Sequence, residues 1–355
     1  MIYSILALNV GLNLMSDFTY RWNLNDLEKV EKNNLKVFSC FSCGGGSTMG
    51  YKMSGFEVIG CNEIDPEMME VYKQNHNPKY SFLESITTFK LREDLPRELY
   101  GLDILDGSPP CSSFSITGNR EKDWGKQKKF KEGQKDQILD DLFFHFIDLA
   151  HKLRPKVIVA ENVKGMIIGK AKGYVKQVIS LLKTAGYDVQ LFLLNGATMG
   201  LPQRRERIFF IARRNDLNWS DLKLSFNEKA IPAKVALADI IDEFYNDCSK
   251  SINKKYWDKC KPGKKFNSVH PKGHLFNLFR VSKDLPFPTL TACSGRKFYR
   301  WDKMATFSTK QLCRISSFPE NFKNTEASLR YQLGMSVPPL MMHKISRQIY
   351  KQWFQ

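Results

Sequence analysis

The sequence lacks the features that mark several large classes of protein. No apolar run reaches the roughly 18 to 20 residues that a membrane-spanning helix needs, and there is no internal repeat or low-complexity segment. The segment Met1–Met15 is apolar but has no basic start and contains two asparagines, so we interpret it as a buried or capping segment and not as a signal peptide. We therefore expect a protein without a membrane partner, whose eight cysteines are reduced thiols in a cytosol.

A metal-binding pattern is also missing. Cys40 and Cys43 form a C-x-x-C pair, but no second pair and no nearby H-x-H completes a tetrahedral site. A thioredoxin-like redox role is the alternative, yet the pair ends an expected strand in a glycine-rich turn, which indicates another use. We expect no metal ion. Four further cysteines are interpreted as structural: Cys248, Cys260, Cys293 and Cys313.

Negative charge is scarce relative to positive charge. The chain has 54 lysines and arginines against 37 aspartates and glutamates, which gives a formal net charge of +17. A chain this basic usually binds a polyanion, most often nucleic acid, although some proteins are basic for solubility alone. A hydrophobic fraction of 42% with 12% aromatic residues is enough for a large core and excludes global disorder. The length of 355 residues suits one large domain with a smaller one, or two of medium size.

The first two-thirds of the chain alternates short apolar runs with amphipathic stretches. The runs predict strands at Lys36–Phe41, Glu57–Cys61, Leu102–Leu105, Lys156–Ala160, Val189–Leu194 and Ile208–Ala212. The amphipathic stretches predict helices at Pro66–His76, Gln137–Leu153 and Tyr174–Ala185. This alternation predicts an α/β fold with a mostly parallel sheet and helices on both faces. Ligands in such sheets bind at the carboxyl ends of the strands.

The pattern changes after Arg214. We expect a first domain over 1–214, a smaller irregular domain over 215–300, and a hinge over 301–331. The stretch Lys250–Lys272 is rich in lysine, with aromatic residues interleaved. The chain is typical of a helix again over Val337–Trp353, so we expect 332–355 to complete the first domain.

Two motifs follow the first expected strands. Phe41-Ser42-Cys43-Gly44-Gly45-Gly46 is a strand-to-helix turn of small residues, which lets the backbone approach a ligand closely. Glu63 ends the second strand, where an acid accepts hydrogen bonds from ribose hydroxyls. There is no Walker lysine and no full G-x-G-x-x-G, so a ribose-bearing ligand without phosphates, such as S-adenosylmethionine, fits best. The alternative is a tight turn without a ligand.

A candidate nucleophile follows the third strand. Cys111 lies in Gly107-Ser108-Pro109-Pro110-Cys111-Ser112, a rigid turn at the sheet's carboxyl edge, although a cysteine taken alone is more often inert packing. The polar, lysine-rich segment Ser113–Gln134 that follows is interpreted as a basic loop able to close over a polyanion.

Two further motifs carry charge. Glu161-Asn162-Val163 follows a very apolar strand, where a half-shielded carboxylate can act as an acid; a helix cap is the equal alternative. In Gln203-Arg204-Arg205-Glu206-Arg207, an extended backbone would put Arg205 and Arg207 on one face. Two such arginines suit phosphate or base-edge contacts, and the alternative is a solvated edge strand.

Taken in order, these motifs resemble the cytosine-C5 DNA methyltransferase family, over roughly Lys36 to Trp353. Two later blocks agree with the family as well, Pro288-Thr289-Leu290-Thr291 and Gly334-Met335-Ser336-Val337-Pro338-Pro339. The resemblance implies a Rossmann-like, S-adenosylmethionine-dependent catalytic domain, with the irregular region as target-recognition domain. It implies cofactor contacts at Phe41, Ser42, Gly44, Gly45, Gly46, Glu63, Ile64, Ser85, Ile86, Pro110, Ser336 and Val337.

The resemblance also implies a mechanism on double-stranded DNA. Cys111 would add to C6 of a flipped cytosine while Glu161 contacts N3, and C5 would then take the methyl group. Arg207 would contact the flipped base, and Arg205 the DNA or the base-binding loop. We expect a monomer of the bacterial or phage type, acting in the bacterial cytoplasm and nucleoid or in the cytoplasm of a phage's host.

The chain departs from the family pattern at several positions. Cys43 stands where the first glycine of F-x-G-x-G-G would be, Ser112 replaces the usual Gln, and Met335 replaces the usual Asn. The acid that contacts the adenine amino group falls at Ser85, with Glu84 as a possible substitute.

Three alternatives stay open at this point. One is a tRNA cytosine-C5 methyltransferase of the same fold, although its Cys-Phe-Thr signature is missing here. Another is amino-group methylation, since Ser108-Pro109-Pro110 matches three of the four places of that motif. The third is a basic DNA-binding module with an inactive cofactor fold.

Overall fold

A computed structural model describes residues 18–110, 141–168, 171–292, 297–324 and 326–355. Its centre is a seven-stranded sheet in the order β3-β2-β1-β4-β5-β8-β6. The strands are β1 (Lys36–Cys40), β2 (Glu57–Glu63), β3 (Tyr80–Leu83), β4 (Ile104–Gly107), β5 (Val157–Val163), β6 (Tyr187–Asn195) and β8 (Glu206–Arg214). Neighbouring strands are parallel except that β8 is antiparallel to both β5 and β6. The predicted α/β class and mostly parallel sheet are confirmed.

The central strands are buried on both faces, which explains why they are apolar runs without alternation. In β5, Val157 and Val159 belong to the core on one face of the sheet, whereas Ile158 and Ala160 belong to the core on the other. The edge strand β3 is only half-buried at alternate residues. Its apolar signal is too weak to predict a strand from the sequence.

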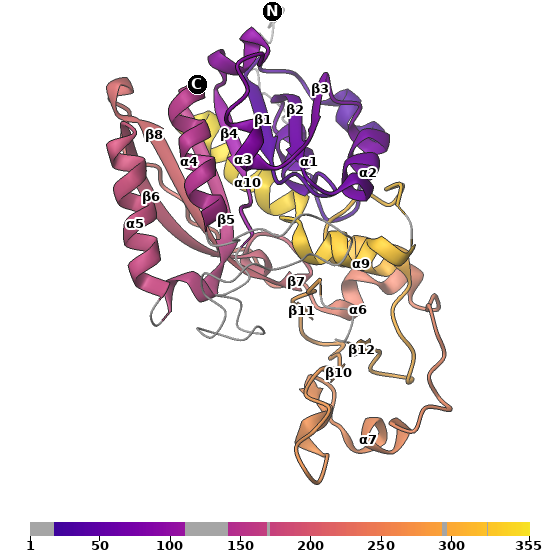
Figure 1. Ribbon diagram of the computed structural model, residues 1–355. Helices are drawn as coiled ribbons and strands as arrows, with labels where there is room; N and C mark the ends of the chain where they lie inside the picture. The colour runs from indigo at the N-terminus through magenta and orange to yellow at the C-terminus, as the bar shows by residue number, and fades with distance from the viewer. Residues whose placement is uncertain (1–17, 111–140, 169–170, 293–296, 325) are drawn as a thin grey trace, which may run out of the picture.

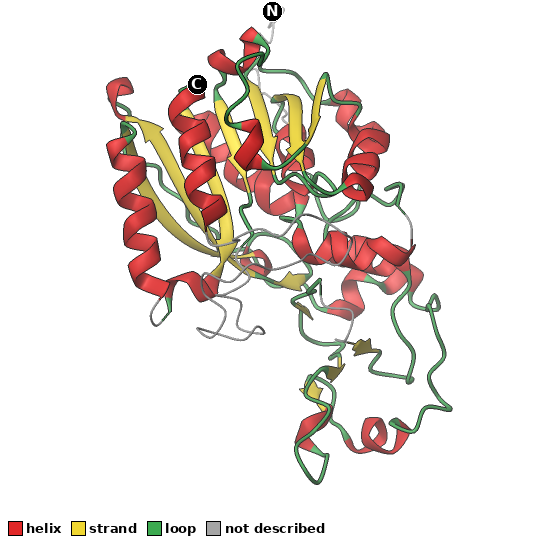
Figure 2. Ribbon diagram, in the orientation of Figure 1, coloured by secondary structure: helices red, strands yellow, loops and turns green. Residues whose placement is uncertain are grey.

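Helices cover both faces of the sheet (Figure 2). The first core includes residues of α1 (Gly46–Met53) and α10 (Pro339–Ile349), and the second includes residues of α3 (Ile86–Phe89), α4 (Leu142–Leu153) and α5 (Ala171–Thr184). α2 (Pro66–His76) begins at a proline, and its N-cap Asp65 accepts bonds from the amides of Glu67 and Met68. In the described part of the chain, every helix is too short or too polar to cross a membrane.

The C-terminal helix completes the sheet domain, as the sequence predicts. α10 packs against α1 at Gly50, where an added Cβ would lie only 2.5 Å from the Cβ of Met342. Glycine at this position therefore lets the two helices approach closely. α10 continues into a π-helical turn over Tyr350–Phe354.

A smaller, irregular unit extends from the sheet domain (Figure 1). It and the segments that join it to the sheet domain contain only short elements: β7 (Gln203–Arg204), β9 (Lys264–Lys265), β10 (Leu278–Arg280), β11 (Phe287–Pro288), β12 (Lys297–Tyr299), α6 (Ala233–Ala236), α7 (Lys254–Lys259), α8 (Thr309–Ile315) and α9 (Glu326–Met335). It has a small core of its own, made by Trp257, Cys260, Phe266, Leu278, Tyr299 and Met304.

Arg280 holds this small core together. Its guanidinium lies 3.7 Å from the centre of the Trp257 ring and donates hydrogen bonds to the carbonyls of Trp257, Cys260 and Trp301. One planar cation thus replaces much of the hydrogen bonding that a regular sheet would supply. Leu222, Ala233 and Ile240, in contrast, pack in the large core with α1 and α10. We propose that the small domain begins after Ile240, later than the expected boundary at 215.

Candidate active site

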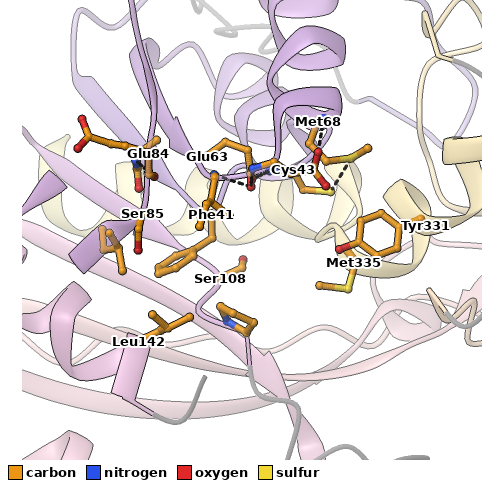
Figure 3. Close-up of a pocket in the computed structure, with 15 residues that line it drawn as sticks. Phe41, Cys43, Glu63, Met68, Glu84, Ser85, Ser108, Leu142, Tyr331 and Met335 are labelled. Atoms are coloured by element: carbon orange, nitrogen blue, oxygen red, sulfur yellow. Dashed lines mark hydrogen bonds between the residues drawn. The ribbon is translucent and has the colours of Figure 1, made fainter. Parts of the chain in front are cut away.

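A cavity opens at the carboxyl ends of β1, β2 and β4 (Figure 3). Six of the expected cofactor residues line it: Phe41, Glu63, Ile64, Ser85, Ile86 and Pro110. The other expected cofactor residues, Ser42, Gly44, Gly45, Gly46, Ser336 and Val337, are not among those that line it. The turn after β1 therefore meets the ends of β2 and β4 around one cavity, as expected for a parallel sheet.

Close packing explains two of the glycines in the turn after β1. Gly45 has a φ of 80°, and a Cβ there would lie 2.0 Å from Nε2 of His76. A Cβ on Gly46 would lie 2.0 Å from the carbonyl oxygen of Val337. These glycines let α2 and the C-terminal block pack closely against the turn. The space beside both glycines is therefore filled by other residues of the protein.

Cys43 occupies a backbone position that favours glycine. Its φ is 46°, in the left-handed region, which explains why the family pattern has glycine here. The side chain lines the cavity, and its Sγ lies 3.7 Å from Sδ of Met68. Burial, followed by the negative charge of Glu63, raises the pKa of the Cys43 thiol to about 12, so the thiol is neutral.

Glu63 is fixed by the backbone around it. Its Oε2 accepts a hydrogen bond of 2.7 Å from the amide of Cys43, and its Oε1 accepts bonds from the amides of Ile64 and Asp65 at 2.8 and 3.0 Å. Burial raises the pKa of this carboxyl, although the three amide bonds oppose that effect. The two amide bonds use both lone pairs of Oε1, so Oε2 is the oxygen that can accept a further bond from a ligand hydroxyl.

The structure separates the two candidates for an adenine contact. Ser85 lines the cavity as the N-cap of α3, and its Oγ accepts a bond from the amide of Thr87. Glu84 also contributes to the lining, but its carboxylate is bound at 2.9 Å by Arg92 and points away from Glu63 in Figure 3. Ser85 Oγ also lies 2.9 Å from the Thr87 hydroxyl, so both side chains have partners in the protein and differ mainly in direction.

Several residues that line the cavity are not predicted from the sequence: Cys43, Asn62, Asp65, Met68, Ser108, Leu142, Tyr331 and Met335. Tyr331 and Met335 lie on α9, far from the other lining residues in sequence. Met335 belongs to the Gly334–Pro339 block that agrees with the family, so that block is a sequence signal for the end of α9.

A second group of functional residues lies at the carboxyl end of β5. Val163 of β5 pairs with Arg207 of β8, and Oε1 of Glu161 lies 2.7 Å from Nε of Arg207. Both side chains are largely buried, at 8% exposure for Glu161 and 12% for Arg207. Burial lowers the pKa of the Arg207 guanidinium, and the carboxylate of Glu161 opposes that effect. The ion pair fixes the orientation of the carboxylate.

Asn162 connects this strand to the turn that carries the candidate nucleophile. Its side-chain amide donates a 3.0 Å hydrogen bond to the carbonyl of Pro109, two residues before Cys111. Pro110 lines the cavity. Cys111 and Ser113–Gln134 lie outside the described residues. The described residues nevertheless bring the end of β5 and the proline turn into direct contact.

Arg205 differs from its expected role. Its side chain is 0% exposed, so it has no surface to offer to DNA in this structure. Its guanidinium donates three hydrogen bonds to backbone carbonyls, at 3.0 Å to Leu290, 2.9 Å to Gly334 and 2.8 Å to Ser336. It therefore connects Leu290, at the end of the small unit, and the Gly334–Pro339 block to the segment just before β8. Burial this complete argues against a direct contact with DNA, and the other expected contact, with the base-binding loop, stays a prediction.

The donor set around the cavity fits an adenosyl ligand. Phe41, Ile64, Ile86 and Leu142 give it apolar walls for a flat base, while Glu63 supplies acceptors. Asp65 also lines it, and its Oδ2 is buried without a hydrogen-bond partner. A buried acceptor without a partner favours a ligand that carries donors. Within the described residues there is no group of three or more His, Cys, Asp or Glu placed to hold a metal ion.

Comparisons with known proteins agree with this geometry. A family profile described as C-5 cytosine-specific DNA methylase matches residues 35–351. Type II methyltransferase M.FnuDI of Fusobacterium nucleatum is 34% identical over 345 residues, covering 89% of this chain and 94% of the relative. Type II methyltransferase M.NgoPII of Neisseria gonorrhoeae is 27% identical over 351 residues, covering 90% of this chain and 96% of the relative.

Solved structures share the fold. A DNA modification methyltransferase candidate encoded within a prophage of E. coli has a TM-score of 0.70 at 19% identity, covering 91% of this chain and 100% of that one. DNMT2 from Spodoptera frugiperda, solved as a mutant, has a TM-score of 0.62 at 18% identity, covering 89% of this chain and 100% of that one.

Proposed function

The chain belongs to the C-5 cytosine-specific DNA methylase family and is a DNA cytosine-5 methyltransferase, and from this premise we propose how its residues divide the work. The observation that carries the proposal is the Glu161–Arg207 ion pair of 2.7 Å, joined through Asn162 to the proline turn before Cys111. These contacts support the proposal, because they hold an oriented carboxylate on the strand that contacts the proline turn before Cys111. Relatives named Type II methyltransferases favour this function over methylation of tRNA.

We propose that S-adenosylmethionine is the methyl donor and that the cavity holds its adenosyl part. Glu63 would accept bonds from the ribose hydroxyls, Ser85 would face the adenine edge, and Phe41, Ile64 and Ile86 would pack against the base. The remaining expected contacts, Ser42, Gly44, Gly45, Gly46, Pro110, Ser336 and Val337, would shape the turn and the walls. The bound cofactor supplies an electrophilic methyl group.

In the proposed reaction the target cytosine is flipped out of the duplex, because its C5 and C6 are inaccessible in the stack. The Cys111 thiolate adds to C6, and Glu161, as a carboxylic acid, gives its proton to N3 and so neutralises the negative charge that the addition creates. The activated C5 then takes the methyl group; loss of its proton and elimination of Cys111 restore the aromatic ring. Arg207 orients Glu161 and contacts the base. Arg205, buried as described, is a positioning residue.

The small domain is proposed to read the DNA sequence, with its lysines on the phosphates. We propose that a monomer is active. We propose that the protein acts where DNA is found, in the cytoplasm of a bacterium or of a phage's host cell.

The nucleophile assignment is tested with Cys111→Ser. Because serine is a far weaker nucleophile than thiolate, we expect methyl transfer to duplex DNA to be lost while DNA binding is kept. Transfer of tritiated methyl groups to duplex DNA and to tRNA, with binding measured by gel shift, provides the assay. A methylating Cys111→Ser enzyme would refute the assignment, and activity on tRNA alone would refute the DNA substrate.

A further inference from the structure

A buried aspartate with no assigned role lies beneath both parts of the active site. Asp106 is in β4, immediately before the Gly107-Ser108-Pro109-Pro110 turn, and is 2% exposed. Its Oδ2 accepts a 2.7 Å hydrogen bond from Oγ of Ser39 in β1, and its Oδ1 accepts a 3.3 Å bond from the Tyr51 hydroxyl in α1. The carboxylate thus joins three elements of the sheet domain.

Those elements carry the two walls of the cavity. β4 continues into Ser108 and Pro110, which line the cavity before Cys111. α1 begins directly after the glycine turn, whose Phe41 and Cys43 line the opposite side. The two hydrogen bonds to Asp106 therefore set the spacing between the cofactor turn and the nucleophile turn.

The surroundings of Asp106 are acidic. Among the described residues, the titratable groups that interact with it are Tyr51 on α1, Cys40 on β1, Tyr72 on α2 and Glu161 on β5. All four become negative when they ionise. Burial raises the pKa of Asp106 from 3.8 to about 7, against the opposing effect of its hydroxyl donors. Folding consequently favours the protonated form, so this carboxyl contributes less to stability as pH rises from about 4 towards 7.

Asp106 lowers the stability of the fold at neutral pH, and it connects the elements that carry two turns of the active site. This combination indicates a functional role. We propose that Asp106 is a positioning residue, whose ionised carboxylate accepts from Ser39 and Tyr51 together and so holds the cofactor turn and the nucleophile turn at their working distance. This inference rests on the proposed cofactor site. When the carboxyl is protonated, one of its oxygens becomes a donor, so the hydrogen bond on that side has to reverse and the hydroxyl there must direct its own hydrogen elsewhere.

The direction of the pH effect follows from this geometry. The competent form is the ionised one, so cofactor affinity rises as pH increases through about 7. For one group that titrates there, about one-tenth is ionised at pH 6, which predicts an approximately tenfold loss of affinity relative to pH 9.

The test measures binding of S-adenosylhomocysteine by titration calorimetry between pH 6 and 9, without DNA and without turnover. We expect a roughly tenfold rise in affinity for the native protein and a flat profile for Asp106→Asn. Asp103→Asn is the matched control, because Asp103 is also buried near β4 but is paired at 2.7 Å with Lys156. It should keep the native pH profile.

Two further measurements distinguish the proposed role of Asp106 from a general loss of stability in the Asp106→Asn variant. Asp106→Asn removes a buried charge, so its Tm at pH 8 should equal or exceed that of the native protein. Ser39→Ala removes the shorter donor, so it should move the midpoint of the binding profile to higher pH. A native-like pH profile in Asp106→Asn would overturn the inference and leave the cofactor site standing. Failure of the native protein to bind S-adenosylhomocysteine at any pH would overturn both.

Discussion

Replacing Arg205 by methionine tests whether this arginine acts through the fold. The substitution keeps most of the side-chain volume but removes the donors to the carbonyls of Leu290, Gly334 and Ser336, at 3.0, 2.9 and 2.8 Å. Removing one partner from a buried charged cluster costs about 3 to 5 kcal/mol, because the remaining polar groups are left buried without bonds. Part of the loss is recovered because the guanidinium no longer has to be desolvated, and burial lowers its pKa well below the usual range.

We therefore expect the free energy of unfolding to fall by about 3 kcal/mol in Arg205→Met, a large share of the roughly 5 to 15 kcal/mol typical of a domain. Urea denaturation followed by circular dichroism measures this loss. Arg204→Met is the matched control: Arg204 is the preceding residue but is exposed, so its loss should stay within about 0.5 kcal/mol. Arg205→Lys should show most of the same loss in the free energy of unfolding, since one ammonium group cannot reach three carbonyls as a planar guanidinium does. Equal stability of Arg205→Met and Arg204→Met would refute the reasoning.

Two other predictions concern the cofactor turn and the DNA surface. Gly46→Ala should lower stability by about 1 to 3 kcal/mol and weaken S-adenosylhomocysteine binding, because its Cβ would lie 2.0 Å from a backbone oxygen. Gly44→Ala, whose Cβ would be 3.5 Å from its nearest neighbour, should change thermal stability little; an equal effect of the two would contradict the packing argument. Replacing four lysines of the small domain by glutamine should weaken the salt dependence of DNA affinity. The slope of log affinity against log salt concentration, measured by fluorescence anisotropy, should become shallower by about 0.9 for each phosphate that is no longer neutralised. These lysines are Lys254, Lys255, Lys264 and Lys265. An unchanged slope would mean that DNA binds to another surface of the protein.

Local sequence is sufficient to predict much of the site. The turn after β1, Glu63 at the end of β2, and the Glu161–Val163 block are each marked by residue types at the ends of apolar runs. Because parallel strands bring their carboxyl ends to one edge, the motifs can be placed together without knowing any contact. The α/β class follows from the same alternation.

Other parts of the site depend on contacts that no local pattern encodes. Tyr331 and Met335 reach the cavity from α9, which comes to this edge of the sheet only after the chain has folded. The role of Gly46 depends on the carbonyl of Val337, almost the whole chain away in sequence. The sequence offers no reason to single out Asp106, because an aspartate in an apolar strand shows its burial and its hydroxyl donors only in three dimensions.

The sequence by itself determined the fold class, the family and the order of the functional motifs, since these depend on residue types and on spacing along the chain. The tertiary structure decided which charged groups face a ligand and which are enclosed. Arg205 and Arg207 are two residues apart and their alternation predicts a shared face, yet one binds three carbonyls and the other binds Glu161. The reason is physical: a guanidinium is directed by the acceptors around it, and those acceptors come from segments distant in sequence.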